Sequence, residues 1–400
     1  MQTKDFIDLE EKYGAHNYNP LDVVIERGQG VWLYDVEGNK YLDCLAAYSA
    51  VNQGHCHPRI IKALKSQAER VTLTSRAFRN DQLPFLYKEL SELTGYEMTL
   101  PMNSGAEAVE TALKAARKWG HSVKGIAAES GDIIVCSNNF AGRTITLISF
   151  STEEQYKTGF GPFTPGFKVI TYGNSDELEK IIDKNTIAFL VEPIQGEGGV
   201  IIPPDGYLKK CFDICKKNNV LFIADEIQTG LGRTGKLFAH QYENIIPDMV
   251  IIGKALSGGC YPVSAVLSNN EILGVFNPGD HGSTFGGNPL GAAVARESLK
   301  VLIDEKLIEN SRNLGEYFLN KLKEIKSKHI KEVRGKGLFI GIELFPEANG
   351  ARRFCKYLMK KGILCKETHD NVIRIAPPLV ITKSEIDEAL IKIKEVLLTD

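Results

Sequence analysis

The chain has 400 residues, a length that allows two domains with a large buried core. Its formal net charge of −2 at pH 7 gives no electrostatic reason to expect binding to nucleic acids or to membrane surfaces. No apolar stretch is long enough to span a bilayer. The N-terminus lacks the apolar core of a signal peptide and the arginine-rich pattern of a transit peptide, so we expect a cytoplasmic protein.

Neither the cysteines nor the histidines predict a metal site. The 8 cysteines are scattered and form no Cys-x-x-Cys pair. Cys211 and Cys215 lie one turn apart in a predicted helix, where we expect two packed thiols of a reducing compartment. The neighbours His55 and His57 lack the spacing of zinc ligands, so we interpret this segment as a turn before Pro58.

The first element that bears on function is the helix predicted within Pro101–Trp119. Ser104 and Glu107 have the spacing of a capping box, and the alanine-rich sequence after them favours a helix. Gly105 lets the backbone approach an anion, and the start of a helix offers free N–H groups and the positive end of the helix dipole. This segment is therefore a candidate phosphate site, although an ordinary capped helix has the same pattern.

Apolar runs alternate with helix-like stretches through the middle of the chain. The predicted strands are Asp132–Cys136, Thr146–Phe150, Ile187–Val191, Val220–Ala224, Met249–Ile252 and Val263–Leu267. Helix-like stretches between them include Ser175–Lys184 and Gly206–Asn219. This alternation predicts an α/β fold with a mostly parallel sheet covered by helices.

Phe140 and Arg143 follow the strand predicted at Asp132–Cys136. An aromatic side chain at the end of a strand can stack on a flat ring. An arginine three residues later can hold a carboxylate through two parallel hydrogen bonds. A core phenylalanine and a surface arginine would give the same local pattern, so this segment alone leaves both interpretations open.

Two further strands end in residues of opposite charge. Val220–Ala224 leads into Asp225, and Met249–Ile252 leads through a glycine into Lys254. The carboxyl ends of parallel strands converge on one crevice, so we expect the two side chains to meet. A desolvated lysine favours its neutral amine, which can form a Schiff base, and an aspartate can keep a pyridine nitrogen protonated. Pyridoxal phosphate requires such a pair, whereas a buried salt bridge or two unrelated residues are the alternatives.

The sequence changes character after residue 289. Residues 290–330 predict a long amphipathic helix rich in lysine, glutamate and leucine. Val333–Phe345 predicts a strand with glycine interruptions, and Ile373–Pro378 predicts a short strand that ends at prolines. We therefore expect a smaller α+β domain at the C-terminal end.

Four segments together resemble the class III pyridoxal-phosphate aminotransferases. They are Asn103–Ala108, Val191–Glu197, Ile223–Gly230 and Ile252–Gly259. Within that class the likeness is greatest to the branch that acts on ornithine. The resemblance implies fold type I, with helices on both faces of a mostly parallel sheet, and a homodimer with active sites at the interface. It also implies an N-terminal segment (1–45) that packs with a small C-terminal domain (290–400), beside a large cofactor-binding domain (46–289).

The resemblance also implies a role for each site residue. Lys254 would carry the cofactor through a covalent imine and move protons, and Asp225 would pair with the ring nitrogen. The segment around Thr284 would complete the phosphate site of the partner subunit. The cofactor-binding residues implied in this way are Gly105, Ala106, Phe140, Glu192, Asp225, Gln228, Lys254, Ser283 and Thr284.

The implied substrates are L-ornithine and 2-oxoglutarate, and both must use one site. Arg143 and Tyr18 would bind the carboxylate end of ornithine, and Tyr48 would line the pocket. Arg374 would bind the α-carboxylate of 2-oxoglutarate, and Glu197 would mask it during the ornithine half-reaction, because an unpaired buried guanidinium is costly. The alternatives are an acetylornithine or other ω-amino-acid aminotransferase, an aminomutase, and a non-catalytic binding protein with the same fold.

Overall fold

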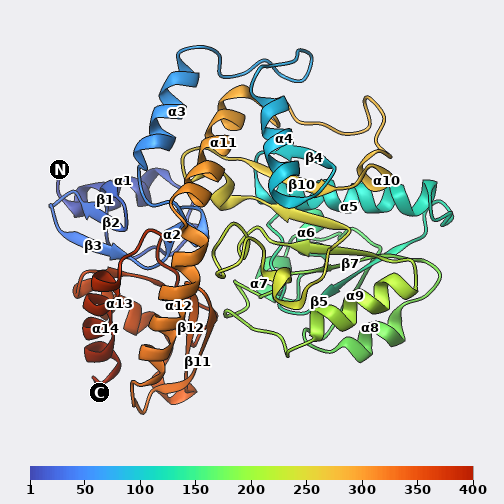
Figure 1. Cartoon of the computed structure of the whole chain (residues 1–400). Helices are drawn as coiled ribbons and strands as arrows, with labels where there is room; N and C mark the ends of the chain where they lie inside the picture. Colours follow the sequence, from blue (N-terminus) through green and yellow to red (C-terminus); the bar gives the residue numbers. More distant parts are fainter. Residues whose placement is uncertain (400) are drawn as a thin grey trace.

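The computed structural model describes residues 1–399, and a mixed sheet lies at the centre of the larger part (Figure 1). Within these residues seven strands pair in the order β4-β10-β9-β8-β7-β5-β6. The strands are β4 (Met98–Met102), β5 (Asp132–Cys136), β6 (Phe167–Ile170), β7 (Thr186–Val191), β8 (Leu221–Asp225), β9 (Met249–Ile252) and β10 (Ser264–Ser268). Strands β5 to β9 are parallel, whereas β10 runs antiparallel to both β4 and β9. The α/β fold with a mostly parallel sheet is confirmed.

Helices cover both faces of this sheet because its central strands are buried on both sides. Ile133 and Val135 of β5 pack in one cluster with apolar residues of α5 (Gly105–Ser122), whereas Ile134 lies in the opposite cluster with residues of α9 (Tyr207–Lys217). Alternate residues of a strand point to opposite faces, so continuous apolar runs such as Thr186–Val191 suit this position. The helical elements of this part are α5 (Gly105–Ser122), α6 (Ile145–Ser149), α7 (Glu154–Lys157), α8 (Ser175–Ile181), α9 (Tyr207–Lys217), η1 (Ala239–Glu243), η2 (Lys254–Ser257) and α10 (Asn270–Leu273).

A second, antiparallel sheet with helices forms the C-terminal part (Figure 1). Its strands pair in the order β11-β12-β15-β14. The elements are α11 (Pro289–Asp304), α12 (Leu307–Lys323), β11 (Ile330–Lys336), β12 (Phe339–Leu344), η3 (Pro346–Ala348), α13 (Arg352–Lys360), β13 (Ile363–Leu364), β14 (Lys366–Thr368), β15 (Val372–Ile375) and α14 (Lys383–Leu397). This sheet carries Arg374 on β15 toward the larger part.

The N-terminal strands join the C-terminal part through a third sheet. Strand β3 pairs in parallel with β13, where Leu42 lies opposite Ile363. Figure 1 shows the blue N-terminal strands beside the red C-terminal helices. The N-terminal elements are α1 (Thr3–Tyr13), β1 (Ile25–Gln29), β2 (Trp32–Asp35), β3 (Lys40–Asp43), α2 (Ala46–Ser49), α3 (Pro58–Ala68) and α4 (Leu83–Thr94). Helix α11 packs on both α3 and α4, and the domain limits at residues 45 and 289 remain a proposal.

Three predicted elements were wrong. The single strand predicted at Val333–Phe345 is two antiparallel strands, β11 and β12, and the chain turns between them at Gly337, whose φ is 55°. The run predicted as a strand at Thr146–Phe150 is helix α6, because the Thr144 side chain accepts a hydrogen bond from the Leu147 N–H and caps a helical turn. The helix predicted over residues 290–330 is two helices, α11 and α12, followed by the start of β11. The break lies at Lys306, whose φ of 53° is left-handed and cannot continue a right-handed helix.

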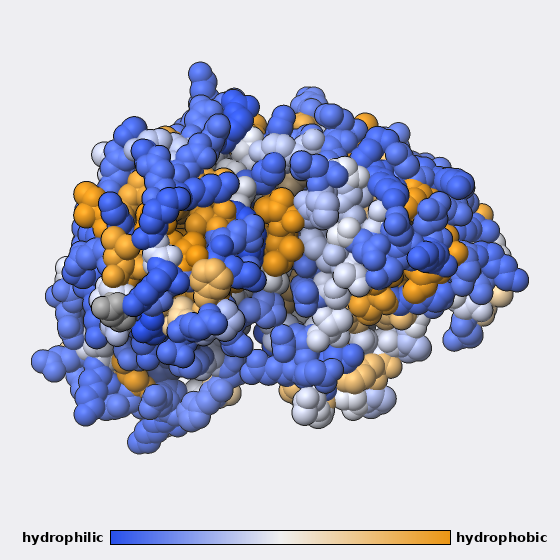
Figure 2. Space-filling view, turned by 90° about the horizontal axis from the view of Figure 1, so that it is seen from below, coloured by the Kyte–Doolittle hydropathy of each residue, from blue (hydrophilic) through white to orange (hydrophobic). Residues whose placement is uncertain are grey.

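In the segment His55–His57, both histidine rings bond to carboxylates of the chain. The His55 ring bonds to Asp43 at 2.7 Å, and the His57 ring bonds to Glu305 at 3.0 Å. Within residues 1–399 no cluster of three potential metal ligands occurs, and none of the helices described has the length and apolarity to cross a membrane. The face seen in Figure 2 is mostly hydrophilic, with separate hydrophobic patches.

Candidate active site

A cavity of about 190 Å³ lies at the carboxyl ends of β7, β8 and β9, beside the start of α5. Parallel α/β sheets bind ligands at this edge. The residues that line the cavity are Gly105, Ala106, Phe140, Ala141, Gly142, Glu192, Asp225, Ile227, Gln228, Thr229 and Lys254. Most residues predicted to bind the cofactor are therefore brought together in one chain.

Lys254 is a strained, half-buried amine at the cavity wall. It follows β9 through Gly253, and its φ of 42° places it in the left-handed region, which is uncommon for a residue with a side chain. Burial lowers the pKa of Lys254, against the opposing charges of Glu197 and Asp225. A lowered pKa increases the share of neutral amine, which is the form that attacks a carbonyl.

Asp225 ends β8 and is 6% exposed. One of its oxygens accepts a hydrogen bond from the Ile227 N–H at 3.0 Å. Burial raises the pKa of Asp225 to about 6, because the hydrogen bond and the charge of Lys254 compensate only part of the desolvation. A cationic group placed against this carboxylate would restore its charged form.

Glu192 is a second carboxylate at the same wall. It accepts hydrogen bonds from the Phe140 N–H at 3.0 Å and from the Gly196 N–H at 3.2 Å. Burial and the neighbouring charge of Asp225 raise its pKa to about 8. Glu192 thus holds the loop of Phe140 in place, and a cation bound between the strand ends would lower its pKa again.

The start of α5 offers donors to an anion. The Ser104 hydroxyl accepts the Glu107 N–H at 3.2 Å, and the Glu107 carboxylate accepts the Ser104 N–H at 2.7 Å, which is the capping box expected from the sequence. The backbone N–H groups of Gly105 and Ala106 occupy the first two helical positions, where no intrahelical acceptor exists. Both residues line the cavity, so these donors are available to a phosphate.

Glu197 and Arg374 form an ion pair at 2.6 Å. The Arg374 side chain is 1% exposed, and within the described residues its Nε and second terminal nitrogen have no hydrogen-bond partner. Gln228 lies between the two, since its amide nitrogen donates to Glu197 at 3.2 Å and its oxygen accepts from Arg374 at 3.3 Å. Burial raises the pKa of Glu197, but the charge and hydrogen bond of Arg374 outweigh burial and hold it below its usual value.

Tyr48 lies on an unusual turn. Ala46, Ala47, Tyr48 and Ser49 have φ values of 49°, 46°, 59° and 72°, so four consecutive residues are left-handed. Such a conformation costs about 1–2 kcal/mol per residue and persists only where the surroundings impose it. The turn places the Tyr48 ring 4.9 Å from the guanidinium carbon of Arg374.

The other predicted substrate residues lie further out. The guanidinium carbon of Arg143 lies 3.5 Å from the centre of the Tyr156 ring and 5.6 Å from that of Phe140, beside the cavity. Tyr18 is 76% exposed and lies in the segment between α1 and β1.

Ser283 and Thr284 lie outside the residues that line the cavity in the described chain. Ser283 accepts a hydrogen bond from Asn103 at 2.9 Å, and Thr284 is exposed. Neither is therefore placed on the cofactor cavity of its own chain.

Sequence reasoning missed several residues of this site. Ile227 lies against the start of α5, where a Cβ on Gly105 would come within 3.2 Å of its side chain. Tyr156, on the short helix α7, supports Arg143. Ile227 lies in the turn after β8, two residues from the predicted Asp225, and this nearness in the sequence was an available signal; no comparable signal marks Tyr156.

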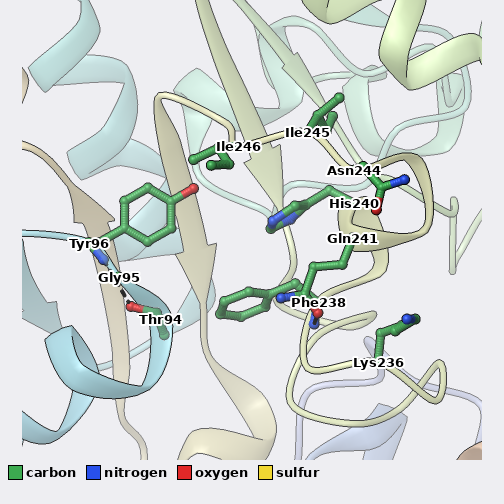
Figure 3. Close-up of a pocket in the computed structure, with 10 residues that line it drawn as sticks. All are labelled: Thr94, Gly95, Tyr96, Lys236, Phe238, His240, Gln241, Asn244, Ile245 and Ile246. Atoms are coloured by element: carbon green, nitrogen blue, oxygen red, sulfur yellow. Dashed lines mark hydrogen bonds between the residues drawn. The ribbon is translucent and has the colours of Figure 1, made fainter.

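A larger cavity of about 580 Å³ lies elsewhere, and none of the predicted site residues lines it. Figure 3 shows Phe238, His240 and Gln241 on one side and Thr94 to Tyr96 on the other. The Tyr96 hydroxyl donates to the Pro247 carbonyl at 2.9 Å, which places this cavity at the edge of the sheet opposite the strand ends that carry Asp225 and Lys254.

The cofactor expected from the sequence fits these groups. Free N–H donors at the start of α5 suit a phosphate, the Asp225 carboxylate suits a protonated ring nitrogen, and Lys254 lies near enough to Asp225 to interact with its charge. Gly142, with a φ of 130°, keeps the cavity wall close to α5, since a Cβ there would come within 3.0 Å of Ala106. The chain therefore supplies anion donors, an anionic partner and an amine in one cavity.

Comparison with known proteins identifies the relatives of the chain. Residues 13–397 match the family model described as aminotransferase class-III. The ornithine aminotransferase of Geobacillus sp. (strain WCH70) is 60% identical over 395 residues, which cover 99% of this chain and 98% of that protein. The crystal structure of the ornithine aminotransferase from Toxoplasma gondii ME49 is 47% identical, with a TM-score of 0.98 over 100% of this chain and 95% of that one. The acetylornithine aminotransferase from Elizabethkingia anophelis is 50% identical, with a TM-score of 0.91 and coverage of 100% and 99%.

Proposed function

The chain belongs to the class III aminotransferases, which are pyridoxal-phosphate enzymes, and we propose that it transfers the δ-amino group of L-ornithine to 2-oxoglutarate. The products are L-glutamate and glutamate 5-semialdehyde, which cyclises to pyrroline-5-carboxylate. The observation that carries this proposal is the buried Glu197–Arg374 pair beside Lys254, which suits a site that must accept two different substrates in turn. The 60% identity to an ornithine aminotransferase supports it.

Pyridoxal phosphate, when bound, supplies an aldehyde that takes up the amino group and a ring that stores the electrons of the broken C–H bond. The residues of the chain hold and orient it. Gly105 and Ala106 would donate their N–H groups to the phosphate, Phe140 would stack on the ring, and Asp225 would keep the ring nitrogen protonated. Lys254 would attach through its neutral amine and then carry the proton between substrate and cofactor as a general acid and base.

Arg374 must be neutralised in the ornithine half-reaction and free to bind a carboxylate in the 2-oxoglutarate half-reaction. Ornithine must present its δ-carbon, so a free guanidinium near Lys254 would attract its carboxylate and favour the wrong end. Glu197 neutralises that guanidinium, and Gln228 bonds to both partners. 2-Oxoglutarate brings a carboxylate of its own, which can replace Glu197 on Arg374 and engage its remaining N–H groups as a bidentate pair.

The distal end of ornithine would be held at the mouth of the site. Arg143, supported by Tyr156, would bind its α-carboxylate, with Tyr18 beside it. Tyr48 would limit the width of the pocket next to Arg374. The alternative is acetylornithine aminotransferase activity. Its support is the 50% identity to the Elizabethkingia enzyme, which is lower than the 60% identity to an ornithine aminotransferase.

A donor panel tests the substrate. We expect L-ornithine to exceed N-acetylornithine and 4-aminobutyrate in kcat/KM with 2-oxoglutarate as acceptor, and a preference for N-acetylornithine would transfer the proposal to the alternative. Lys254→Ala should abolish turnover. Lys124→Ala is the matched control, because Lys124 also has a pKa lowered by burial but donates to backbone carbonyls at Thr186 and Asn219.

We further propose a cytoplasmic homodimer in which Ser283 and Thr284 serve the phosphate site of the partner subunit. All eight cysteines, which lie within the described residues, are free, which suits a reducing compartment. Mixing subunits tests the dimer. A hybrid of Lys254→Ala and Thr284→Ala subunits regains one intact site if Thr284 acts in the partner, and none if it acts in its own chain. Cofactor retention and turnover of the hybrid therefore decide the arrangement.

A further inference from the structure

Asn52 and Gln53 are fully buried polar neighbours, 0% and 1% exposed, that follow the left-handed turn of Tyr48. Their side chains bond to two different loops. Gln53 reaches the loop after β9, which begins at Lys254, and Asn52 reaches the loop after β8, which carries Gln228. Neither was predicted as a site residue, and neither lines the cavity of the described chain.

Gln53 fixes the carbonyl of Ala255, the residue that follows Lys254. Its amide nitrogen donates to the Ala255 carbonyl at 3.1 Å and to the Ser298 hydroxyl at 2.7 Å. The Ser298 hydroxyl donates in turn to the same Ala255 carbonyl at 3.0 Å. The Gly258 N–H also bonds to this oxygen at 3.0 Å. Three donors therefore converge on one carbonyl, and its orientation has little freedom.

The three hydrogen bonds to the Ala255 carbonyl stabilise a strained backbone conformation at Lys254. A lysine with a φ of 42° is strained and keeps that conformation only where its surroundings impose it. The Ala255 carbonyl belongs to the residue that follows Lys254, so bonds to it oppose rotation of the strained segment toward a relaxed conformation. The Ser257 hydroxyl, which donates to the Lys254 carbonyl at 3.1 Å, acts on the same turn.

Asn52 holds the second loop in the same way. Its amide nitrogen donates to the Leu231 carbonyl at 3.0 Å, and its oxygen accepts from Arg233 at 2.5 Å. Arg233 is 0% exposed and also donates to the carbonyls of Leu338 and Pro377 in the C-terminal part, at 2.9 and 2.6 Å. Asn52 thus connects the Gln228 loop, through Arg233, to the region that carries Arg374.

We propose that the dipeptide Asn52–Gln53 is a positioning element that fixes the Lys254 loop relative to the Gln228 loop. The two side chains come from adjacent residues, so a displacement of one loop is passed to the other through about one residue of rigid backbone. The inference rests on the proposed role of Lys254, but not on the identity of the amino donor. Its distinguishing feature is that the dipeptide acts without touching cofactor or substrate.

Gln53→Met tests the proposal, because methionine keeps the length of the side chain and removes its donors. Gln67→Met is the matched control, since Gln67 is also buried, 3% exposed, and its amide donates to a backbone carbonyl, that of Val71, at 2.9 Å. In the apoprotein we expect hydrogen–deuterium exchange of residues 253–258 to become about tenfold faster in Gln53→Met, the effect of losing about 1.4 kcal/mol of local stability, and to stay unchanged in Gln67→Met.

In the cofactor-loaded protein, Gln53→Met should shift the pH at which the visible absorption band of the cofactor titrates. It should also lower kcat about 10- to 100-fold, while KM for 2-oxoglutarate changes little. Unchanged exchange, titration and kcat would overturn the proposal. If Gln53→Met does not fold, Ser298→Ala removes another donor to Ala255 and must accelerate exchange of the same segment. An inactive wild type would count against the proposed function, whereas the exchange result in the apoprotein is independent of it.

Discussion

Glu197→Gln removes the charge of the Glu197–Arg374 pair and keeps its shape. We expect the substitution to change mainly the interaction with Arg374, because the two side chains are in contact at 2.6 Å and Arg374 is 1% exposed. Hydrogen bonds to a charged group contribute about 1.5–3 kcal/mol; the bond of the Arg374 guanidinium to a carboxylate belongs at the upper end of this range, and its bond to the neutral amide of the variant at the lower end. The difference, about 1–1.5 kcal/mol, corresponds to roughly a five- to tenfold change in an equilibrium constant.

In the proposed mechanism 2-oxoglutarate displaces residue 197 from Arg374, so weakening that bond should lower KM for 2-oxoglutarate by about five- to tenfold. The exposed guanidinium should also accept the carboxylate of ornithine, which brings the α-amine to Lys254. We therefore expect the variant to form some α-transamination product that the wild type does not form. Both effects have the same cause, the loss of a competing anion.

Steady-state kinetics with each substrate varied, together with mass spectrometry of the oxo-acid products, measure these effects. Glu89→Gln is the matched control, because Glu89 is a half-buried partner of Arg296 at 2.9 Å on a helix pair that lies outside the cavity. An unchanged or higher KM for 2-oxoglutarate in Glu197→Gln, with ornithine still used only at its δ-amine, would refute the reasoning.

Three further predictions concern the frame of the site. Burial raises the pKa of Glu192 to about 8 in the folded protein, so the stability that depends on its protonated form is lost as the pH rises through about 8. The Tm of the apoprotein, measured by calorimetry, should therefore fall between pH 5 and pH 9. A Glu192→Gln variant whose Tm has the same dependence on pH would contradict this. Ser104→Ala should lower the free energy of unfolding in urea by about 1 kcal/mol, because it removes the cap of α5, whereas Ser122→Ala at the other end should cost less. Gly142→Ala should lower the free energy of unfolding by about 1–3 kcal/mol, because a Cβ would lie 2.7 Å from the Leu147 side chain. Gly38 also has a positive φ but lies in open space, so Gly38→Ala measures the backbone strain alone. Equal losses of unfolding free energy in the two variants would refute the packing effect.

The parts of the site that the sequence predicted are those set by local rules. Asp225 and Lys254 each end an apolar run, so their convergence followed from the geometry of parallel strands. The capping box of Ser104 and Glu107 marked the start of α5 within one segment. The residue types on these elements carry the chemistry, which is why the cofactor could be named before the structure.

Other parts depend on contacts between distant segments, which no local pattern encodes. The left-handed turn at Tyr48 contains two alanines and no glycine, although glycine is the usual signal for positive φ. The bonds of Gln53 to Ala255 span about two hundred residues of chain. The wrong strand at Thr146–Phe150 shows the same limit at short range, because an apolar run of five residues fits a buried strand and a capped helical turn equally well.

The parallel pairing of Leu42 with Ile363 has a consequence for biosynthesis. The ribosome must add 363 − 42 = 321 residues after Leu42 before the strand can find its neighbour. At about 5–20 residues per second this takes roughly 16–64 s, during which the edge of β3 stays open to other nascent chains. The first sheet therefore keeps one unpaired edge until Ile363 has been synthesised.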